Sequence, residues 1–166
     1  MTTSSDQNAS GTLCVRKACL DDAEVLFSWL NTDNSLDGKL ETTGPVLWSD
    51  HLDWFRNRMQ RTDCFIYIIE LDAVPRGQIR FESKSGDLEI DIFLAAGSRR
   101  SGAAKVALEQ ALGFLGMDTN AQTVIARVLK TNEISASFFI KCGFTEVQAY
   151  PGTRVFSFDL PPKETC

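Results

Sequence analysis

The feature that most constrains this chain is a strand that runs through a short loop directly into a helix. Residues 88–94 (LEIDIFL) alternate apolar and other side chains, as expected of a strand with one buried face. After a Gly/Arg/Ser loop, alanines and leucines at helical spacing predict a helix over about residues 101–115. The free N–H groups at such a helix start favour an anion. Because Gly102 lacks a Cβ, a diphosphate could approach the backbone closely there.

Two other interpretations of this loop are possible from the residues. The first is a surface loop with a small-residue helix start, which the residues alone leave open. The second is a nucleotide triphosphatase, because residues 97–102 (GSRRSG) match the first half of a P-loop. In that motif a lysine and a Ser or Thr should follow, but Ala103 and Ala104 stand there, so we do not predict a nucleotide triphosphatase.

The rest of the chain predicts one α+β domain over residues 13–160, with a single sheet and interleaved helices. Strands are expected at 13–16, 65–71, 77–82, 123–129, 144–147 and 155–160, and helices from Asp21 or Asp22, from about Ser49, and from Asn132 to Gly143. The run 65–71 (FIYIIEL) alternates little, which indicates a strand buried on both faces. Residues 1–12 and 161–166 are expected to be tails, the first of them disordered.

Composition excludes several classes of function. The net charge of -5 argues against a nucleic-acid partner, which requires a basic face. No apolar run approaches the ~20 residues of a membrane-spanning helix, and no signal peptide is evident, so we expect a cytoplasmic protein without a membrane partner. One histidine and five cysteines without CxxC spacing predict no metal site.

Two segments carry a resemblance to a known family. Residues 99–104 (RRSGAA) are similar to the R/Q-x-x-G-x-G/A pyrophosphate loop of GNAT acetyltransferases, and they follow the strand that this loop requires. After the strand 123–129, residues 132–144 (NEISASFFIKCGF) are similar to the family's N-x-x-S-x-x-x-[YF]-x-x-x-G-F helix. The resemblance implies the GNAT fold, a mostly antiparallel splayed sheet flanked by helices, with acetyl-CoA as co-substrate and no metal.

The resemblance also implies where acetyl-CoA is held. The pantetheine arm would lie between the strands 88–94 and 123–129, against the backbone around Ile92, Phe93 and Leu94. The pyrophosphate would bind backbone N–H groups between Arg100 and Lys105. The full set of expected cofactor contacts is Ile92, Phe93, Leu94, Arg99, Arg100, Ser101, Gly102, Ala103, Ala104, Lys105, Asn132, Ser135 and Phe139. A plain helix N-cap is the alternative role for Asn132.

The N-terminal half resembles one branch of the family more narrowly. Residues 29–31 (WLN), 48–55 (WSDHLDWF) and 77–81 (GQIRF) look like the branch that contains the amino-sugar N-acetyltransferase of pseudaminic acid biosynthesis. The acceptor implied is the 4-amino group of a nucleotide-linked sugar, and a homodimer is compatible with it. The expected acceptor contacts are Trp29, Asn31, His51, Trp54 and Arg80. For His51 and Trp54, a structural role within the core stays open.

The chemistry requires a base for the amine and a way for the thiol to leave. Glu89 and Asp91 lie on one face of the predicted strand, and either would take the ammonium proton, directly or through water. Relatives carry a tyrosine acid where this chain has Phe139, which cannot donate a proton. An alkyl thiol ionises near pH ~8.5 and leaves fairly well unprotonated, and water or Ser135 would otherwise substitute. Alternatives are acetylation of a protein N-terminus or another small amine, or acyl-CoA binding without turnover.

Overall fold

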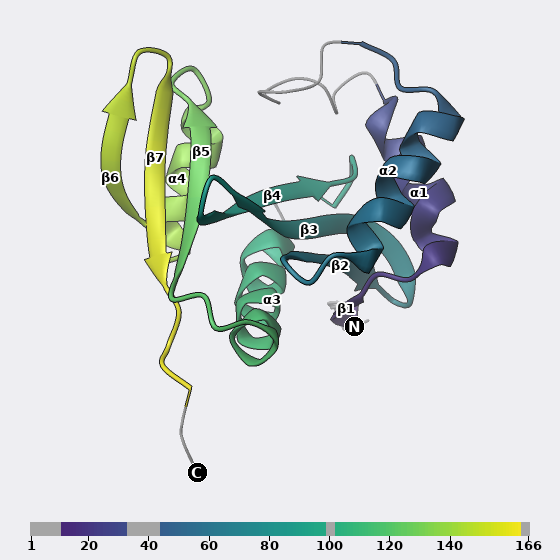
Figure 1. Ribbon diagram of the computed structural model, residues 1–166, viewed down its shortest axis with the longest axis horizontal. Helices are drawn as coiled ribbons and strands as arrows, with labels where there is room; N and C mark the ends of the chain where they lie inside the picture. Colours follow the sequence, from purple (N-terminus) through teal and green to yellow (C-terminus); the bar gives the residue numbers. More distant parts are fainter. Residues whose placement is uncertain (1–10, 33–43, 99–101, 164–166) are drawn as a thin grey trace, which may run out of the picture.

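The computed structural model describes residues 11–32, 44–98 and 102–163, and its strands form one seven-stranded sheet in the order β1-β2-β3-β4-β5-β7-β6 (Figure 1). The strands are β1 (Leu13–Lys17), β2 (Cys64–Leu71), β3 (Val74–Lys84), β4 (Asp87–Leu94), β5 (Thr123–Leu129), β6 (Thr145–Tyr150) and β7 (Thr153–Asp159). The helices are the short 3₁₀ turn η1 (Leu20–Asp22), α1 (Ala23–Leu30), α2 (Trp48–Gln60), α3 (Ala103–Asp118) and α4 (Glu133–Lys141). Among the described residues, no helix is both long enough and apolar enough to cross a membrane.

The sheet is parted at its centre. Neighbouring strands are antiparallel, except that β4 and β5 pair in parallel. That parallel ladder holds two residue pairs, Leu88 with Val124 and Glu89 with Ile125. Beyond it β4 continues to Leu94, while β5, β7 and β6 turn away as a separate ribbon (Figure 1). The predicted splayed, mostly antiparallel α+β sheet is confirmed.

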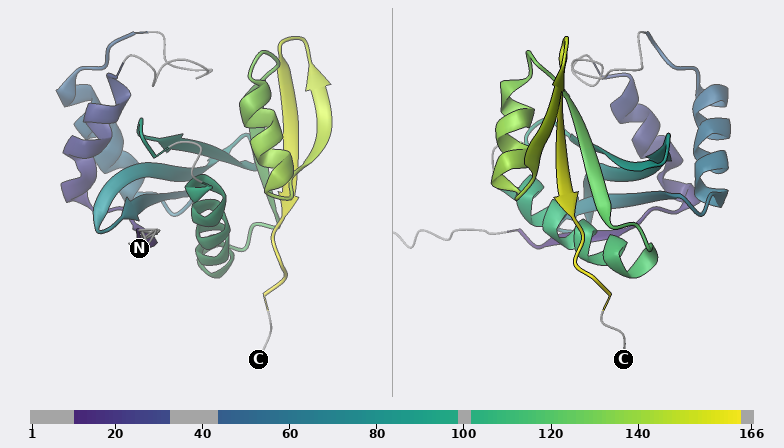
Figure 2. Two further views of the ribbon diagram at one scale, coloured as in Figure 1. Left: turned by 180° about the vertical axis from the view of Figure 1, so that it is seen from behind. Right: turned by 60° about the vertical axis from the view of Figure 1, so that its left-hand side comes forward.

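Two hydrophobic clusters cover the two faces of the sheet. One face packs against α3 and α4, and the opposite face of β2 packs against α1 and α2 (Figure 2). Strand β2 contributes to both, because Tyr67 and Ile69 join the first cluster while Ile66 and Ile68 join the second. The prediction that this strand is buried on both faces is therefore correct. The two faces of the sheet have different surroundings, which matters for the site on β4.

Strand β4 shows the alternation that its sequence predicts. Ile90, Ile92 and Leu94 pack against the cluster under α3. The intervening side chains point to the face that α1 and α2 cover, where Phe93 contacts Trp29 and Asp91 contacts Arg80. The carboxylates of β4 therefore lie on the opposite side of the sheet from α3.

Element ends differ from the predicted ones by a few residues. Helix α3 runs to Asp118 rather than residue 115, because Thr119 N–H still donates to the Leu115 carbonyl at 3.0 Å. Asp22 is the N-cap residue of α1, one of the two residues predicted there, but no N–H of α1 donates to its side chain. Its carboxylate accepts from Cys19 N–H and from Arg16, each at 2.8 Å, and thereby joins the start of α1 to β1.

Candidate active site at the parting of the sheet

The start of α3 lies at the end of the loop that follows β4. Gly102 is the N-cap residue, with φ 75°, a left-handed conformation that favours glycine. Apart from its chain neighbours, no described residue has an atom within 4 Å of the position that a Cβ would take there, which leaves room for a ligand beside this backbone. Ala104 and Lys105 belong to the first helical turn, whose N–H groups have no partner within the helix. The expected contacts Arg99, Arg100 and Ser101 lie outside the described residues.

The free end of β4 is held in place by a close approach of β3. Gly77 pairs with Leu94, and a Cβ on Gly77 would overlap the carbonyl oxygen of Phe93. The backbone at Phe93 and Leu94, where the pantetheine arm is expected, is thus positioned by a glycine on the neighbouring strand. This role of Gly77 was not predicted from its place in the GQIRF segment.

Helix α4 begins on the far side of the parting. The Asn132 side-chain oxygen accepts from Ser135 N–H at 3.1 Å, so Asn132 is the helix N-cap, and a cofactor role for it stays a prediction. Phe139 is 5% exposed and packs among Phe144 and Phe156, with ring centroids at 5.0 and 6.5 Å. Its ring therefore fills the core, which leaves little of it for a cofactor to contact.

The face of β3 and β4 below α1 and α2 brings three of the five expected acceptor contacts together. Trp29 of α1 lies 5.6 Å from the Phe93 ring. Trp54 of α2 has the guanidinium of Arg80 at 5.1 Å from its ring centroid. Both tryptophans are half-buried against the cluster under these helices. The result is an aromatic and cationic wall beside the carboxylate-bearing face of β4.

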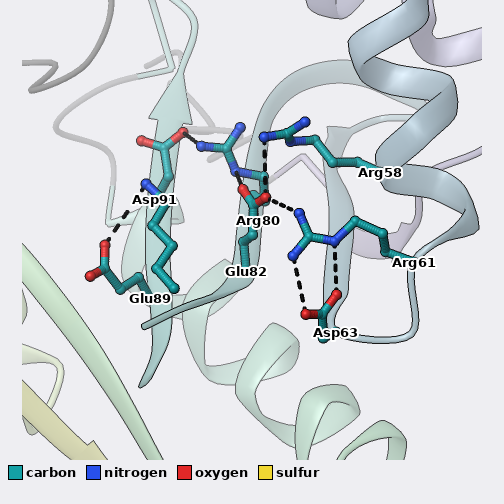
Figure 3. A network of polar contacts seen from close by, with 8 residues as sticks. Arg58, Arg61, Asp63, Arg80, Glu82, Glu89 and Asp91 are labelled. Carbon is teal, nitrogen blue, oxygen red and sulfur yellow. Dashed lines mark hydrogen bonds and ion pairs between the residues drawn. The ribbon is translucent and has the colours of Figure 1, made fainter. Parts of the chain in front are cut away.

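A network of ion pairs crosses this face (Figure 3). Glu82 of β3 is 4% exposed and forms ion pairs with Arg58 at 3.2 Å, with Arg80 at 3.5 Å and with Arg61. Figure 3 shows Arg80 between Glu82 and Asp91, with Asp91 at 3.6 Å from its guanidinium. Glu82, Arg58 and Arg61 were not among the predicted site residues. The sequence signal for this cluster is Glu82, a charged residue that lies on the same strand face as Arg80.

Glu89 has stronger partners than Asp91. Its Oε1 accepts from Arg127 Nε of β5 at 2.6 Å, and Lys84 lies 3.9 Å from Oε2. Asp91 makes one ion pair, at the longer distance of 3.6 Å, among the contacts seen in the described residues. Both carboxylates lie on the same face, as predicted, but Asp91 is less constrained.

Comparison with known proteins identifies the family. A model described as an acetyltransferase (GNAT) domain matches residues 12–145 of the chain. This chain belongs to the GNAT acetyltransferase family. A search of the curated proteins found no match.

Solved structures share the fold of this GNAT acetyltransferase at low sequence identity. The spermidine N-acetyltransferase of Vibrio cholerae, solved with CoA and spermine, has a TM-score of 0.78 at 14% identity, covering 89% of this chain and 95% of that one. A ribosomal-protein α-N-acetyltransferase in complex with coenzyme A gives 0.77 at 12%, covering 92% and 96%. A GNAT-family acetyltransferase of Streptococcus pneumoniae gives 0.71 at 14%, covering 90% and 100%.

Two expected acceptor contacts of the acetyltransferase have structural roles. His51 is 1% exposed, its Nε2 lies 2.8 Å from the Ala23 carbonyl, and burial lowers its pKa against the opposing effect of that hydrogen bond. A direct substrate contact by His51 does not fit this burial. Asn31 exchanges two hydrogen bonds with the Val46 backbone, at 3.1 and 3.2 Å, and so joins the end of α1 to the segment before α2.

The acetyltransferase shows no group of three or more metal-ligating side chains within 11–32, 44–98 and 102–163. Cys14 and Cys19 are exposed, while Cys64 and Cys142 are buried. Burial raises the pKa of the Cys64 thiol to about 11, and Glu82 adds to the effect. This thiol is therefore protonated at neutral pH and unsuited to act as a nucleophile.

Proposed function

We propose that this acetyltransferase moves the acetyl group of acetyl-CoA to a primary amine, the 4-amino group of a nucleotide-linked amino sugar, by direct attack in a ternary complex. The observation that carries the proposal is the two-pair ladder between β4 and β5, with the α3 start at the end of the loop that follows β4. A strand that continues without its parallel partner offers backbone groups to an extended amide chain, and a helix start offers N–H groups to a phosphate.

The residues present fit acetyl-CoA. Backbone around Ile92–Leu94 would hold the pantetheine arm, and the first turn of α3, from Gly102 to Lys105, would hold the pyrophosphate. The open space at Gly102 and its left-handed backbone support this placement. Bound acetyl-CoA supplies an activated acetyl thioester, and the chain supplies position and proton transfer.

Asp91 and Glu89 are the two candidates for the proton acceptor, and we favour Asp91 because of the contacts that each makes. Glu89 Oε1 already accepts a 2.6 Å hydrogen bond from Arg127, so taking a proton would disrupt an ion pair, whereas the ion pair of Asp91 with Arg80 is longer, at 3.6 Å. Asp91 would take the proton of the acceptor ammonium and leave the neutral amine that attacks. Trp29 and Phe93 would exclude water beside it.

The departing thiol needs no acid from this chain. Phe139 is buried and has no proton to donate. A thiol with an ordinary pKa of about 8.5 can leave as thiolate and be protonated by solvent. We therefore expect turnover to persist without a tyrosine at position 139.

The charges of the site favour an oxygen-rich acceptor over a polyamine. Polyamines carry several positive charges and require unpaired carboxylates. On this face, Glu82 is held by three arginines, Glu89 by Arg127 and Lys84, and Asp91 by Arg80. Aromatic rings and guanidinium groups suit a sugar linked to a nucleotide. A protein N-terminus is the second candidate, because a structure with 12% identity and the same fold is a ribosomal-protein α-N-acetyltransferase.

The test is release of thiol from acetyl-CoA in the presence of defined amines. Three acceptors are compared at equal concentration: a 4-amino sugar nucleotide, a peptide with a free N-terminus, and spermidine. Release that depends on the sugar nucleotide supports the proposal, while release with the peptide alone supports the second candidate. Binding of acetyl-CoA without release for any amine would mean that the chain is an acyl-CoA-binding module.

A further inference from the structure

Two arginines beside Trp54 have more hydrogen-bond donors than the described residues fill. Arg58 lies 4.5 Å and Arg80 5.1 Å from the centroid of the Trp54 ring, so the indole holds both guanidinium groups. Each guanidinium carries five N–H donors in a plane. Within the described residues, their ion-pair contacts are at 3.2 Å from Arg58 to Glu82, and at 3.5 and 3.6 Å from Arg80 to Glu82 and Asp91.

One of these donors is buried and lacks a partner among the residues that the structure describes. It is the Nε of Arg58, which is shielded from solvent and makes no hydrogen bond to residues 11–32, 44–98 or 102–163. A buried donor without a partner costs roughly 1–3 kcal/mol, so native structures rarely keep one that nothing fills. The contacts of Arg80, at 3.5 and 3.6 Å, are longer than good hydrogen bonds. The described residues therefore leave one donor of Arg58 unfilled and hold Arg80 only through long contacts.

The position of the pair points to the acetyl acceptor. Arg80 lies directly opposite Asp91 in the β3–β4 register, and Asp91 belongs to the strand that would hold the pantetheine arm. Figure 3 shows Arg58 and Arg80 approaching the same carboxylate, Glu82, from α2 and from β3. Glu82 is also held by Arg61, so Asp91 is the carboxylate with which an incoming anion would share Arg80.

We infer that Arg58 and Arg80, stacked on Trp54, form an anion subsite that binds a phosphate or carboxylate group of the acceptor. Tetrahedral and planar oxyanions accept several N–H bonds at once, which suits two guanidinium forks better than a hydroxyl does. The inference rests on the proposed function for the role of the ligand as acetyl acceptor. Binding of the anion itself does not depend on acetyl transfer.

The first measurement follows the arginine Nε–H signals of ¹⁵N-labelled protein by NMR during titration with sodium phosphate at constant ionic strength. Acetyl-CoA is absent. We expect saturable shifts of the Arg58 and Arg80 signals and of the Trp54 indole N–H, with the signal of exposed Arg56 unchanged. A parallel titration with sodium acetate separates the sources: a response to phosphate alone indicates a phosphate-bearing acceptor, and an equal response to acetate indicates a carboxylate-bearing one.

Three lysine variants test the assignment without removing charge beside buried Glu82. Arg58→Lys and Arg80→Lys lose the planar fork and should raise the dissociation constant of the anion by about tenfold or more. Arg56→Lys, on the same helix, should bind as the parent does. The inference is overturned if neither anion gives a saturable shift, or if all three variants bind equally well. Anion binding without thiol release in the presence of the sugar nucleotide would support the subsite and reject the proposed acceptor. Thiol release that depends on the sugar nucleotide, without anion binding at these arginines, would reject the subsite alone.

Discussion

Glu89 and Arg127 form an ion pair across the point where β4 and β5 separate. Glu89 Oε1 accepts from Arg127 Nε at 2.6 Å, and Arg127 also approaches Asp87 at 3.7 Å. The hydrogen bond with Glu89 raises the pKa of Arg127. Because the ladder ends at Glu89 and Ile125, this ion pair ties the two halves of the sheet together at the base of their parting.

Replacing Arg127 should therefore affect acetyl-CoA binding as well as stability. We expect Arg127→Gln to raise the acetyl-CoA dissociation constant several-fold, because the parting loses the tie at its base. The free energy of unfolding should fall by about 1 kcal/mol, as for other partly exposed ion pairs. Calorimetric titration and urea unfolding measure the two quantities.

Arg154→Gln is the matched control for that variant. Arg154 of β7 pairs with Glu146 of β6 at 2.8 Å and with Glu133 of α4 at 3.3 Å, so neither of these ion pairs joins β5 to β4. It should lose similar stability and leave acetyl-CoA affinity unchanged. Equal losses of affinity in the two variants would show that Arg127 acts through global stability and does not shape the parting.

Asp91→Asn should lower turnover more than any other single carboxylate change. General-base catalysis contributes about 10² to 10⁴ in rate, so we expect kcat to fall at least 100-fold with an unchanged acetyl-CoA dissociation constant. Glu89→Gln should also lower turnover more than affinity, but by less than Asp91→Asn, because Glu89 is engaged by Arg127. Steady-state kinetics decides between them, and the reverse ranking would return the base assignment to Glu89.

Gly77→Ala should displace the end of β4. The new Cβ would overlap the Phe93 carbonyl oxygen, and neither backbone can move without disturbing the β3–β4 ladder. Overpacking of this kind costs about 1–3 kcal/mol. Gly113→Ala is the control, because Gly113 lies inside α3 with open space around it, and there alanine should add about 0.5–1 kcal/mol of stability. Denaturant unfolding of both variants tests the pair, and no loss in Gly77→Ala would mean that the strand end is not fixed by this contact.

Stability should fall as pH drops below about 6.5, because of His51. Burial lowers the pKa of His51 in the folded protein, while the unfolded chain keeps the ordinary value of 6.5. Between these two pKa values the unfolded state binds the extra proton, so unfolding becomes more favourable as pH decreases. The stabilisation is complete above the unfolded pKa and is lost as pH falls toward the folded one.

The chain contains one histidine, so this titration can be assigned without ambiguity. Urea unfolding at steps between pH 5 and pH 7.5 should show the slope in the parent and a weaker one in His51→Gln. In the folded parent protein, the imidazole NMR signals of His51 should titrate below pH 6.5. An identical slope in the variant would contradict the assignment.

Much of the fold could be predicted from the sequence because local patterns carried it. The alternation at 88–94 gave the two faces of β4, and the unbroken apolar run at 65–71 predicted a strand used by both cores. The site was harder to predict because it depends on pairing between distant strands. The ion pair of Glu89 could not be predicted from the sequence, because its partner Arg127 is 38 residues away.

The burial of individual side chains on one helix could not be predicted either. Trp54 and His51 are three residues apart on one helix, yet Trp54 holds two guanidinium groups while His51 is enclosed by aromatic rings. Helical spacing indicates a shared face but not how deeply each side chain is buried. The depth is set by the packing of the helix against α1 and β2.

The most direct test is the thermal unfolding midpoint with and without acetyl-CoA, for the parent protein and for Gly102→Glu and Gly86→Glu. Both glycines have positive φ and open surroundings, so the two variants carry similar backbone strain. At about a hundredfold over the dissociation constant, acetyl-CoA should stabilise the parent by roughly 2.7 kcal/mol, a rise of about 5–10 °C. We predict that Gly86→Glu keeps this rise and that Gly102→Glu loses most of it. No rise in the parent at millimolar acetyl-CoA, or an equal rise in all three proteins, would contradict a cofactor site at the start of α3.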